Sequence, residues 1–260
     1  MSERLSADAR QVITRWQRLP VPVRRVIVRS RRLSHFSRPP RPQVTVDLVD
    51  RVAVITFDDG KVNAISRHAA KLLAEAHECV PSDEKVMAVV LAGRAGQFSA
   101  GFDLDTLVIG GPARQDLLRT GWNMLIRYLT SPIPLVVACT GNAVAAGAAL
   151  LLAGDVRLAA AGEFTIGFNE AAIGLPLPGL LLMLARDRLA PDAYGEATAG
   201  ARMYSPPEAL AAGFVNCVVP AADLITTALA EAGRLASLPP ESFGNDKPHA
   251  YRPSRRQISI

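Results

Sequence analysis

Two short, wholly apolar runs, Val86–Leu91 and Leu135–Cys139, most constrain what this chain can fold into. A third run, Val156–Ala159, is apolar apart from one arginine. Such runs are typical of central strands in a parallel sheet, which are covered on both faces. Between them we expect helices over 114–130 and 145–153. Strands that alternate with helices indicate an α/β domain.

The flanking sequence extends this pattern. Apolar and polar residues alternate over 44–48 and again over 53–57, with a polar turn between them, which predicts a β-hairpin. Ser66 precedes a segment whose apolar residues share one helical face, so a helix is expected to begin there. Beyond Pro178 the chain is mostly helical, with helices expected over 178–189, 191–199, 206–212 and 221–237 and one more strand over Val215–Val219.

Charge is divided unevenly along the chain. Residues 1–42 hold 11 arginines against Glu3 and Asp8, whereas the remaining 218 residues carry 18 basic and 22 acidic side chains. The net charge of +5 therefore comes from the first 42 residues. Because the body has no basic excess, we expect the folded part to bind no nucleic acid.

The domain is expected to span 43–240, with less ordered segments on either side. For residues 1–42 we predict a basic, disordered extension, because polar stretches broken by proline seldom bury a core. They lack the apolar segment of a secretory signal, but their arginine-rich composition also fits a transit peptide or a membrane-surface arm. The polar and basic residues 241–260, which include Pro248 and Pro253, are expected to form a loose tail.

The longest uncharged stretch, Tyr128–Gly154, does not predict a membrane helix. Pro132 and Pro134 break it, and its uninterrupted apolar part, Ala143–Ala153, is too short to cross a bilayer. We therefore expect a buried strand followed by a buried helix, and no integral membrane segment. Three cysteines without a CxxC pair and four scattered histidines predict neither a disulfide framework nor a metal site. This cysteine usage favours a cytoplasmic location.

Two turns rich in glycine and alanine, Gly96–Leu104 and Thr140–Ala149, each lie between a predicted strand and a predicted helix. Small residues let a ligand approach the backbone, and the first N–H groups of a helix have no intrahelical partner. Two such N–H groups aimed at one point would form an oxyanion hole. The alternative is that the small residues only allow tight packing of helix against strand.

Glu170 is the only charged residue between Glu163 and Arg186. In such an apolar segment its carboxylate would be desolvated, which raises its pKa toward the range useful for a general base. The alternatives are a turn carboxylate or an ion pair with an arginine such as Arg157.

Other chemistries find less support. The spacing around Ser99 is not that of a nucleophile elbow, and His249 is the only later histidine, so a serine hydrolase is not expected. Four aspartates in predicted loops are interpreted as caps and turns, with magnesium ligands as the alternative. They are Asp58, Asp59, Asp103 and Asp105.

Taken together, these segments resemble the crotonase superfamily of enoyl-CoA hydratases and isomerases from about Val44 to Pro240. Asp58–Ile65 resembles the loop that lines the CoA thioester channel, Phe98–Leu104 matches the A-G-x-D signature, and Gly141–Asp155 matches the second signature. The resemblance implies that the oxyanion donors are the backbone N–H groups of Phe102 and Ala146. It also implies a set of substrate-binding residues, Lys61, Val62, Asn63, Ala64, Ala100, Gly101, Asp103, Leu104 and Gly147.

The same resemblance implies a spiral of ββα units followed by a mainly helical C-terminal region, assembled as a homotrimer or a dimer of trimers. The implied substrate is an acyl-CoA thioester, so that coenzyme A arrives with the substrate and no separate cofactor is needed. Hydratases of the family use two glutamates; here Ala149 matches the first and Glu170 the second. Ile166-Gly167-Phe168-Asn169-Glu170 resembles the single-glutamate enoyl-CoA isomerases, and Glu170 is then the catalytic base. The alternatives are an enoyl-CoA hydratase or a non-catalytic acyl-CoA-binding protein of the same fold.

Overall fold

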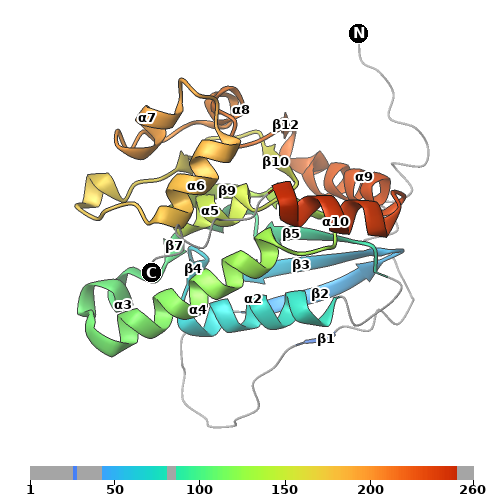
Figure 1. The fold of residues 1–260 in the computed structure, drawn as a ribbon, viewed down its shortest axis with the longest axis horizontal. Helices are drawn as coiled ribbons and strands as arrows, with labels where there is room; N and C mark the ends of the chain where they lie inside the picture. Colours follow the sequence, from blue (N-terminus) through green and yellow to red (C-terminus); the bar gives the residue numbers. More distant parts are fainter. Residues whose placement is uncertain (1–25, 28–42, 81–85, 251–260) are drawn as a thin grey trace.

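The computed structural model describes residues 26–27, 43–80 and 86–250 and has the predicted α/β fold (Figure 1). Its largest sheet has the strand order β1-β2-β3-β5-β8-β10-β12. The β1–β2 and β2–β3 pairs are antiparallel, and every pair from β3 to β12 is parallel. The strands are β1 (Val26–Ile27), β2 (Gln43–Val49), β3 (Val52–Asp58), β5 (Ala88–Gly93), β8 (Leu135–Cys139), β10 (Val156–Ala160) and β12 (Cys217–Val219).

Most of the helices lie close to their predicted positions, but those over Leu104–Ile109 and Pro240–Ala250 were not predicted. Ser66 caps the first described helix, because its Oγ atom accepts a hydrogen bond from the Ala69 N–H at 3.1 Å. Within the described segments, no helix combines the length and apolarity needed to cross a membrane. The helices are α2 (Arg67–Cys79), α3 (Leu104–Ile109), α4 (Gly111–Leu129), α5 (Ala146–Leu152), α6 (Gly179–Arg188), α7 (Tyr194–Thr198), α8 (Pro206–Ala212), α9 (Leu224–Ala236) and α10 (Pro240–Ala250).

The central strands are buried on both faces. In β5, Val89 and Leu91 belong to the core that contains side chains of α2 and α4, whereas Val90 and Ala92 belong to the core under α9. This alternation follows from the two-residue period of a strand. A strand covered on both sides has no polar face, which explains why the sequence runs here are apolar throughout.

Two small sheets stand beyond the carboxyl ends of the main strands and carry the glycine-rich turns. One has the order β11-β9-β6 and the other pairs β4 with β7, in parallel in both cases. Because β6 follows β5 and β9 follows β8, both turns emerge at the same edge of the large sheet. Their strands are β4 (Ala64–Ile65), β6 (Gly96–Ser99), β7 (Gly101–Phe102), β9 (Gly141–Val144) and β11 (Ile166–Gly167).

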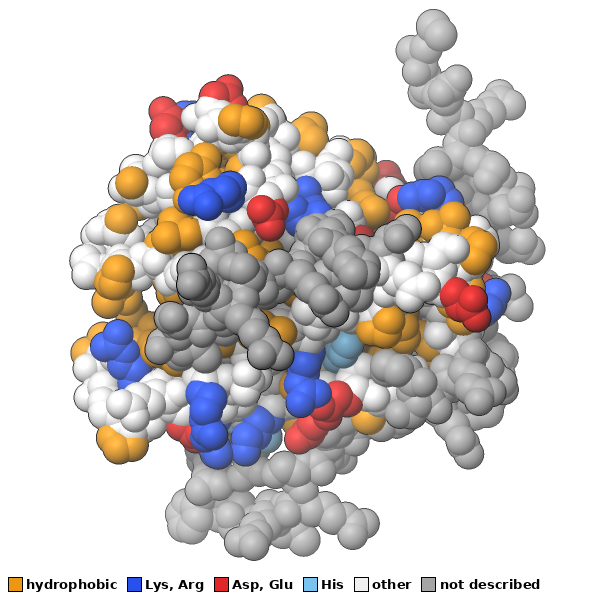
Figure 2. Space-filling view, viewed as in Figure 1, with side chains coloured by type: hydrophobic (Ala, Val, Ile, Leu, Met, Phe, Trp, Pro, Cys, Tyr) orange, Lys and Arg blue, Asp and Glu red, His pale blue; other side chains and the backbone are white. Residues whose placement is uncertain are grey.

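The surface carries interspersed charges. On the face in Figure 2, basic and acidic side chains lie among neutral ones and form no continuous basic area. Ion pairs join neighbouring helices, as between Arg67 of α2 and Asp116 of α4 and between Arg127 of α4 and Glu78 of α2. Such a mixed surface agrees with the near-balanced charge of the body of the chain.

The predicted loose tail, 241–260, is wrong for residues 241–250, which form most of α10. The Lys247 Nζ atom donates to Asp155 Oδ2 at 2.7 Å and to the Ile133 carbonyl at 3.3 Å, and both charged side chains are buried. This ion pair anchors an otherwise polar helix to the start of β8. Residues 251–260 lie outside the described residues. Most of the predicted extension, residues 1–42, also lies outside the described residues. Its described part, Val26–Ile27, forms β1 and pairs with β2 instead of being disordered.

We expect Lys247→Met to lower the free energy of unfolding by about 3 kcal/mol, because it leaves the buried Asp155 carboxylate without its cation. Urea denaturation measures the change. Lys71→Met, at an exposed position of α2, is the matched control and is expected to change stability by less than about 0.5 kcal/mol. Equal, small effects of both substitutions would show that the ion pair does not hold α10.

Candidate functional site

The two glycine-rich turns pack directly against each other. Gly101 has φ +88°, and a Cβ atom there would lie 2.8 Å from the Val144 carbonyl oxygen and 3.1 Å from the Ala146 nitrogen. A Cβ atom on Gly147 would lie 2.3 Å from the Ser99 carbonyl oxygen. Tight packing therefore explains both glycines. The same contact brings the Ala146 amide next to the chain that leads into Phe102.

Two backbone N–H groups of these turns have no partner in their own element. Ala146 is the first residue of α5, so its N–H has no intrahelical acceptor. The preceding residue, Ala145, has φ +54° and donates its N–H to the Gly167 carbonyl at 2.9 Å. Directly after β7 (Gly101–Phe102), the Asp103 N–H donates to the Ile65 carbonyl of β4 at 3.2 Å. Because neighbouring N–H groups of a strand point to opposite edges, that of Phe102 points away from β4.

Glu170 follows β11 and precedes a single 3-10 turn over Ala171–Ile173. Its side chain is 8% exposed, and its Oε2 atom has no hydrogen-bond partner among the described residues. Burial raises the pKa of Glu170, and the backbone N–H groups of Glu170 and Asn169 oppose this rise in part. The Arg157 guanidinium, the proposed alternative partner, donates to the carbonyls of Gly213 and Phe214. The strand before Glu170, β11, pairs with β9 of the second glycine-rich turn.

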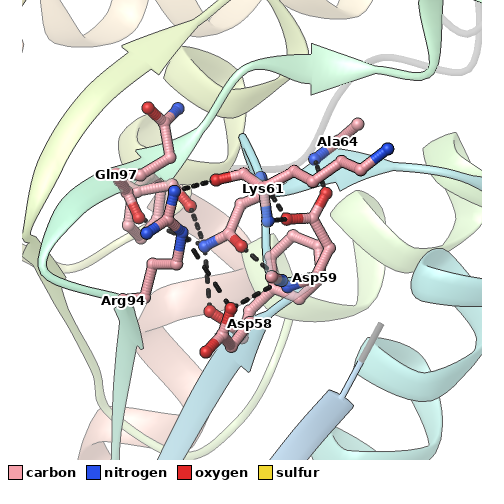
Figure 3. A network of polar contacts seen from close by, with 10 residues as sticks. Asp58, Asp59, Lys61, Ala64, Arg94 and Gln97 are labelled. Carbon is pink, nitrogen blue, oxygen red and sulfur yellow. Dashed lines mark hydrogen bonds and ion pairs between the residues drawn. The ribbon is translucent and has the colours of Figure 1, made fainter. Parts of the chain in front are cut away.

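A network of polar contacts shapes the loop between β3 and β4 (Figure 3). The Asp59 carboxylate accepts hydrogen bonds from the N–H groups of Lys61, Asn63 and Ala64 at 2.7, 2.8 and 2.9 Å. Asp58 accepts a similar bond from the Gly60 N–H at 2.7 Å. The prediction that these aspartates form turns is confirmed.

Asn63 joins this loop to the first glycine-rich turn. Its side chain is fully buried, and Nδ2 donates to the carbonyls of Phe57, Gln97 and Phe98 at 2.9, 3.1 and 3.1 Å. The backbone carbonyl of Asn63 accepts a hydrogen bond from Ser99 Oγ at 2.8 Å. The same Ser99 Oγ atom accepts a hydrogen bond from the Gly101 N–H at 3.2 Å. Asn63 has φ +54°, a conformation that asparagine tolerates better than most residues. This role of the Asn63 amide and of Ser99 has no signal in the sequence, because only the folded chain brings the three carbonyls together.

The structure brings together most of the predicted substrate-binding residues. Val62 accepts a hydrogen bond from the Ala100 N–H at 3.0 Å, and Ala64 pairs with Gly101. Figure 3 shows the exposed Lys61 side chain extending away from the network.

Two further predicted residues lie at the start of α3. Asp103 caps α3 by accepting from the Thr106 N–H at 3.2 Å, as the cap interpretation predicts, and Leu104 is an exposed residue of α3. Their contacts with substrate stay a prediction. Across the described ranges, no three histidine, cysteine or acidic side chains gather as metal ligands would.

A match to a protein-family model shows which family this chain belongs to. The family described as enoyl-CoA hydratase/isomerase matches residues 48–258. The chain belongs to the crotonase family. The resemblance inferred from the sequence motifs is thereby confirmed. Human mitochondrial enoyl-CoA delta isomerase 1 is 29% identical over 191 residues, which cover 72% of this chain and 63% of the human protein, less than two thirds of its length. A putative enoyl-CoA hydratase of Thermus thermophilus is 33% identical over 202 residues, or 74% and 77% of the two chains.

Solved crotonase structures have the same fold. An enoyl-CoA hydratase/isomerase family protein from Pseudomonas syringae superposes with a TM-score of 0.77 at 36% identity, covering 80% of this chain and 90% of that one. Human mitochondrial delta3-delta2-enoyl-CoA isomerase superposes with a TM-score of 0.78 at 28% identity, covering 80% and 83%. The predicted crotonase fold with a helical C-terminal region is confirmed. Both activities of the family occur among these relatives.

We expect Asn63→Asp to lower the free energy of unfolding by at least about 3 kcal/mol, because it buries a carboxylate and takes the donor from three carbonyls. Urea denaturation tests this. Asn142→Asp is the matched control: Asn142 is half-buried and uses Oδ1 to accept from the Thr165 N–H at 2.9 Å, which an aspartate can still do. It is expected to cost less than about 1 kcal/mol. A small cost at Asn63 as well would contradict the role given to its amide.

Proposed function

We propose that this crotonase is an enoyl-CoA isomerase that converts a 3-enoyl-CoA into a 2-enoyl-CoA. The observation that carries the proposal is the buried carboxylate of Glu170, whose Oε2 atom has no protein partner within the described residues. Ala149, the position of the other family glutamate, is a fully buried alanine in α5. Isomerisation needs one group that removes a proton and returns it, and one carboxylate can do both.

In the proposed mechanism, the thioester carbonyl oxygen accepts hydrogen bonds from the N–H groups of Phe102 and Ala146. Glu170 removes a proton from C2, and the electrons of the C–H bond move onto the carbonyl oxygen to form a dienolate. The protonated Glu170 then delivers the same proton to C4, the double bond shifts to C2=C3, and the carbonyl is restored. Fixed backbone dipoles stabilise the negative oxygen without reorganising, and one such donor contributes roughly 3 kcal/mol to lowering the barrier.

Hydration is the second candidate, because relatives of this chain include proteins named as enoyl-CoA hydratases. Adding water across C2=C3 requires a group that activates the water and one that protonates carbon. With Ala149 in place of the first glutamate, Glu170 alone would have to do both, which favours isomerisation. We further propose an acyl-CoA thioester as the ligand and, from the family resemblance, a homotrimer or a dimer of trimers.

Glu170→Gln is expected to lower kcat for a 3-enoyl-CoA at least a hundredfold with KM within about threefold, because the amide keeps the shape but is not a base. Glu163→Gln, at an exposed position before β11, is the matched control and is expected to keep full activity. Turnover is followed by formation of the conjugated 2-enoyl-CoA, with a 2-enoyl-CoA as parallel substrate. Activity of Glu170→Gln within a few-fold of wild type would exclude Glu170 as the base. Binding of acyl-CoA in calorimetry without turnover of either substrate would favour the non-catalytic alternative.

The pH dependence of kcat/KM gives a second test. Because burial raises the pKa of Glu170, the ionised base is present above that raised value and is lost as the pH falls through it. The acid limb of the profile is therefore expected above the ordinary glutamate value of 4.5. Circular dichroism at each pH separates titration from unfolding. An acid limb at or below 4.5 in folded protein would contradict a desolvated base.

A further inference from the structure

A glycine lies in the middle of the longest described helix, where glycine is unfavourable. Gly121 belongs to α4 (Gly111–Leu129) and is buried together with its neighbours Trp122 and Leu125. Glycine lowers helix stability relative to alanine because it loses more backbone freedom on folding. A buried glycine at this place therefore needs an explanation in packing.

The explanation is the ring of Phe102. A Cβ atom on Gly121 would lie 2.1 Å from Phe102 Cε1 and 2.5 Å from Cζ, far inside contact distance. The next residue of α4, Trp122, meets the same ring edge-on, with centroids 4.8 Å apart and planes at 82°. Gly121 and Trp122 thus form a seat on α4 for the Phe102 side chain.

The backbone of Phe102 is fixed on both sides of this side chain. Gly101 before it lies against the second turn, and Asp103 after it caps α3. With both neighbours held and Trp122 packed against the ring, we expect a displaced ring to move the peptide units of residue 102. The N–H of Phe102 is the group that the proposed mechanism aims at the thioester oxygen.

We infer that Gly121 is a positioning residue, which sets the direction of the Phe102 N–H by admitting the Phe102 ring against α4. The inference rests on the proposed isomerase function. It couples the oxyanion donor to a helix that contributes no donor of its own. A purely structural role of Gly121 would alter stability but not the turnover of folded enzyme.

The test is Gly121→Ala, alone and combined with Phe102→Ala, in the full chain with a 3-enoyl-CoA as substrate. Phe102→Ala keeps the backbone N–H and removes the ring. We expect Gly121→Ala to lower kcat at least tenfold with KM within threefold, and to change kcat less than twofold in the Phe102→Ala background. Gly233→Ala is the matched control: Gly233 also lies inside a helix, α9, with no atom within 4 Å of an added Cβ. It is expected to leave kcat unchanged and to keep or raise Tm.

The outcomes distinguish a failure of the inference about Gly121 from a failure of the proposed function. A kcat of Gly121→Ala within twofold of wild type, or an undiminished effect without the ring, overturns the inference while the isomerase proposal stands. Should Gly121→Ala not fold, Phe102→Ala alone decides: a kcat at least fivefold lower at unchanged KM supports the inference, and a kcat within twofold overturns it. Wild-type protein that does not turn over the 3-enoyl-CoA overturns the proposed function and the inference with it.

Discussion

Direct contact between two backbones is the constraint on which the candidate site depends. At Gly101 and Gly147 the two turns approach more closely than any side chain would permit. This contact needs both small sheets, which in turn need the parallel strands β5 and β8 to end at one edge. Main-chain geometry therefore places the amide of Ala146, and it places the amide of Phe102 together with the packing of the Phe102 ring against α4.

Polar and aromatic contacts fix this arrangement from outside. The Asn63 amide holds the β3–β4 loop to the first turn through three carbonyls, and the Phe102 ring holds the same turn to α4. All of these contacts are buried or half-buried, where hydrogen bonds and packing are least disturbed by water. Glu170 differs, because its buried Oε2 atom lacks a protein partner among the described residues. A buried carboxylate without a protein partner is a candidate for moving a proton.

Local signals predicted the parts of this fold that depend on local chemistry. Apolar runs located β5 and β8, Ser66 located the start of α2, and the isolation of Glu170 in the sequence predicted its burial. The helix α10 escaped prediction because its anchor, Lys247, meets Asp155 across 92 residues of chain. The role of Asn63 escaped for the same reason, since its partners Gln97 and Phe98 lie more than 30 residues away. Long-range pairing leaves no periodic trace in a sequence.

The ion pair between Asp155 and Lys247 has a consequence for how the domain is made. Synthesis runs from the N-terminus, so the carboxylate of Asp155 is completed long before its ammonium partner exists. Until residue 247 has left the ribosome, Asp155 lacks its counter-charge and α10 cannot dock. Docking of α10 therefore completes the packing around the central sheet only after the strands themselves have been made.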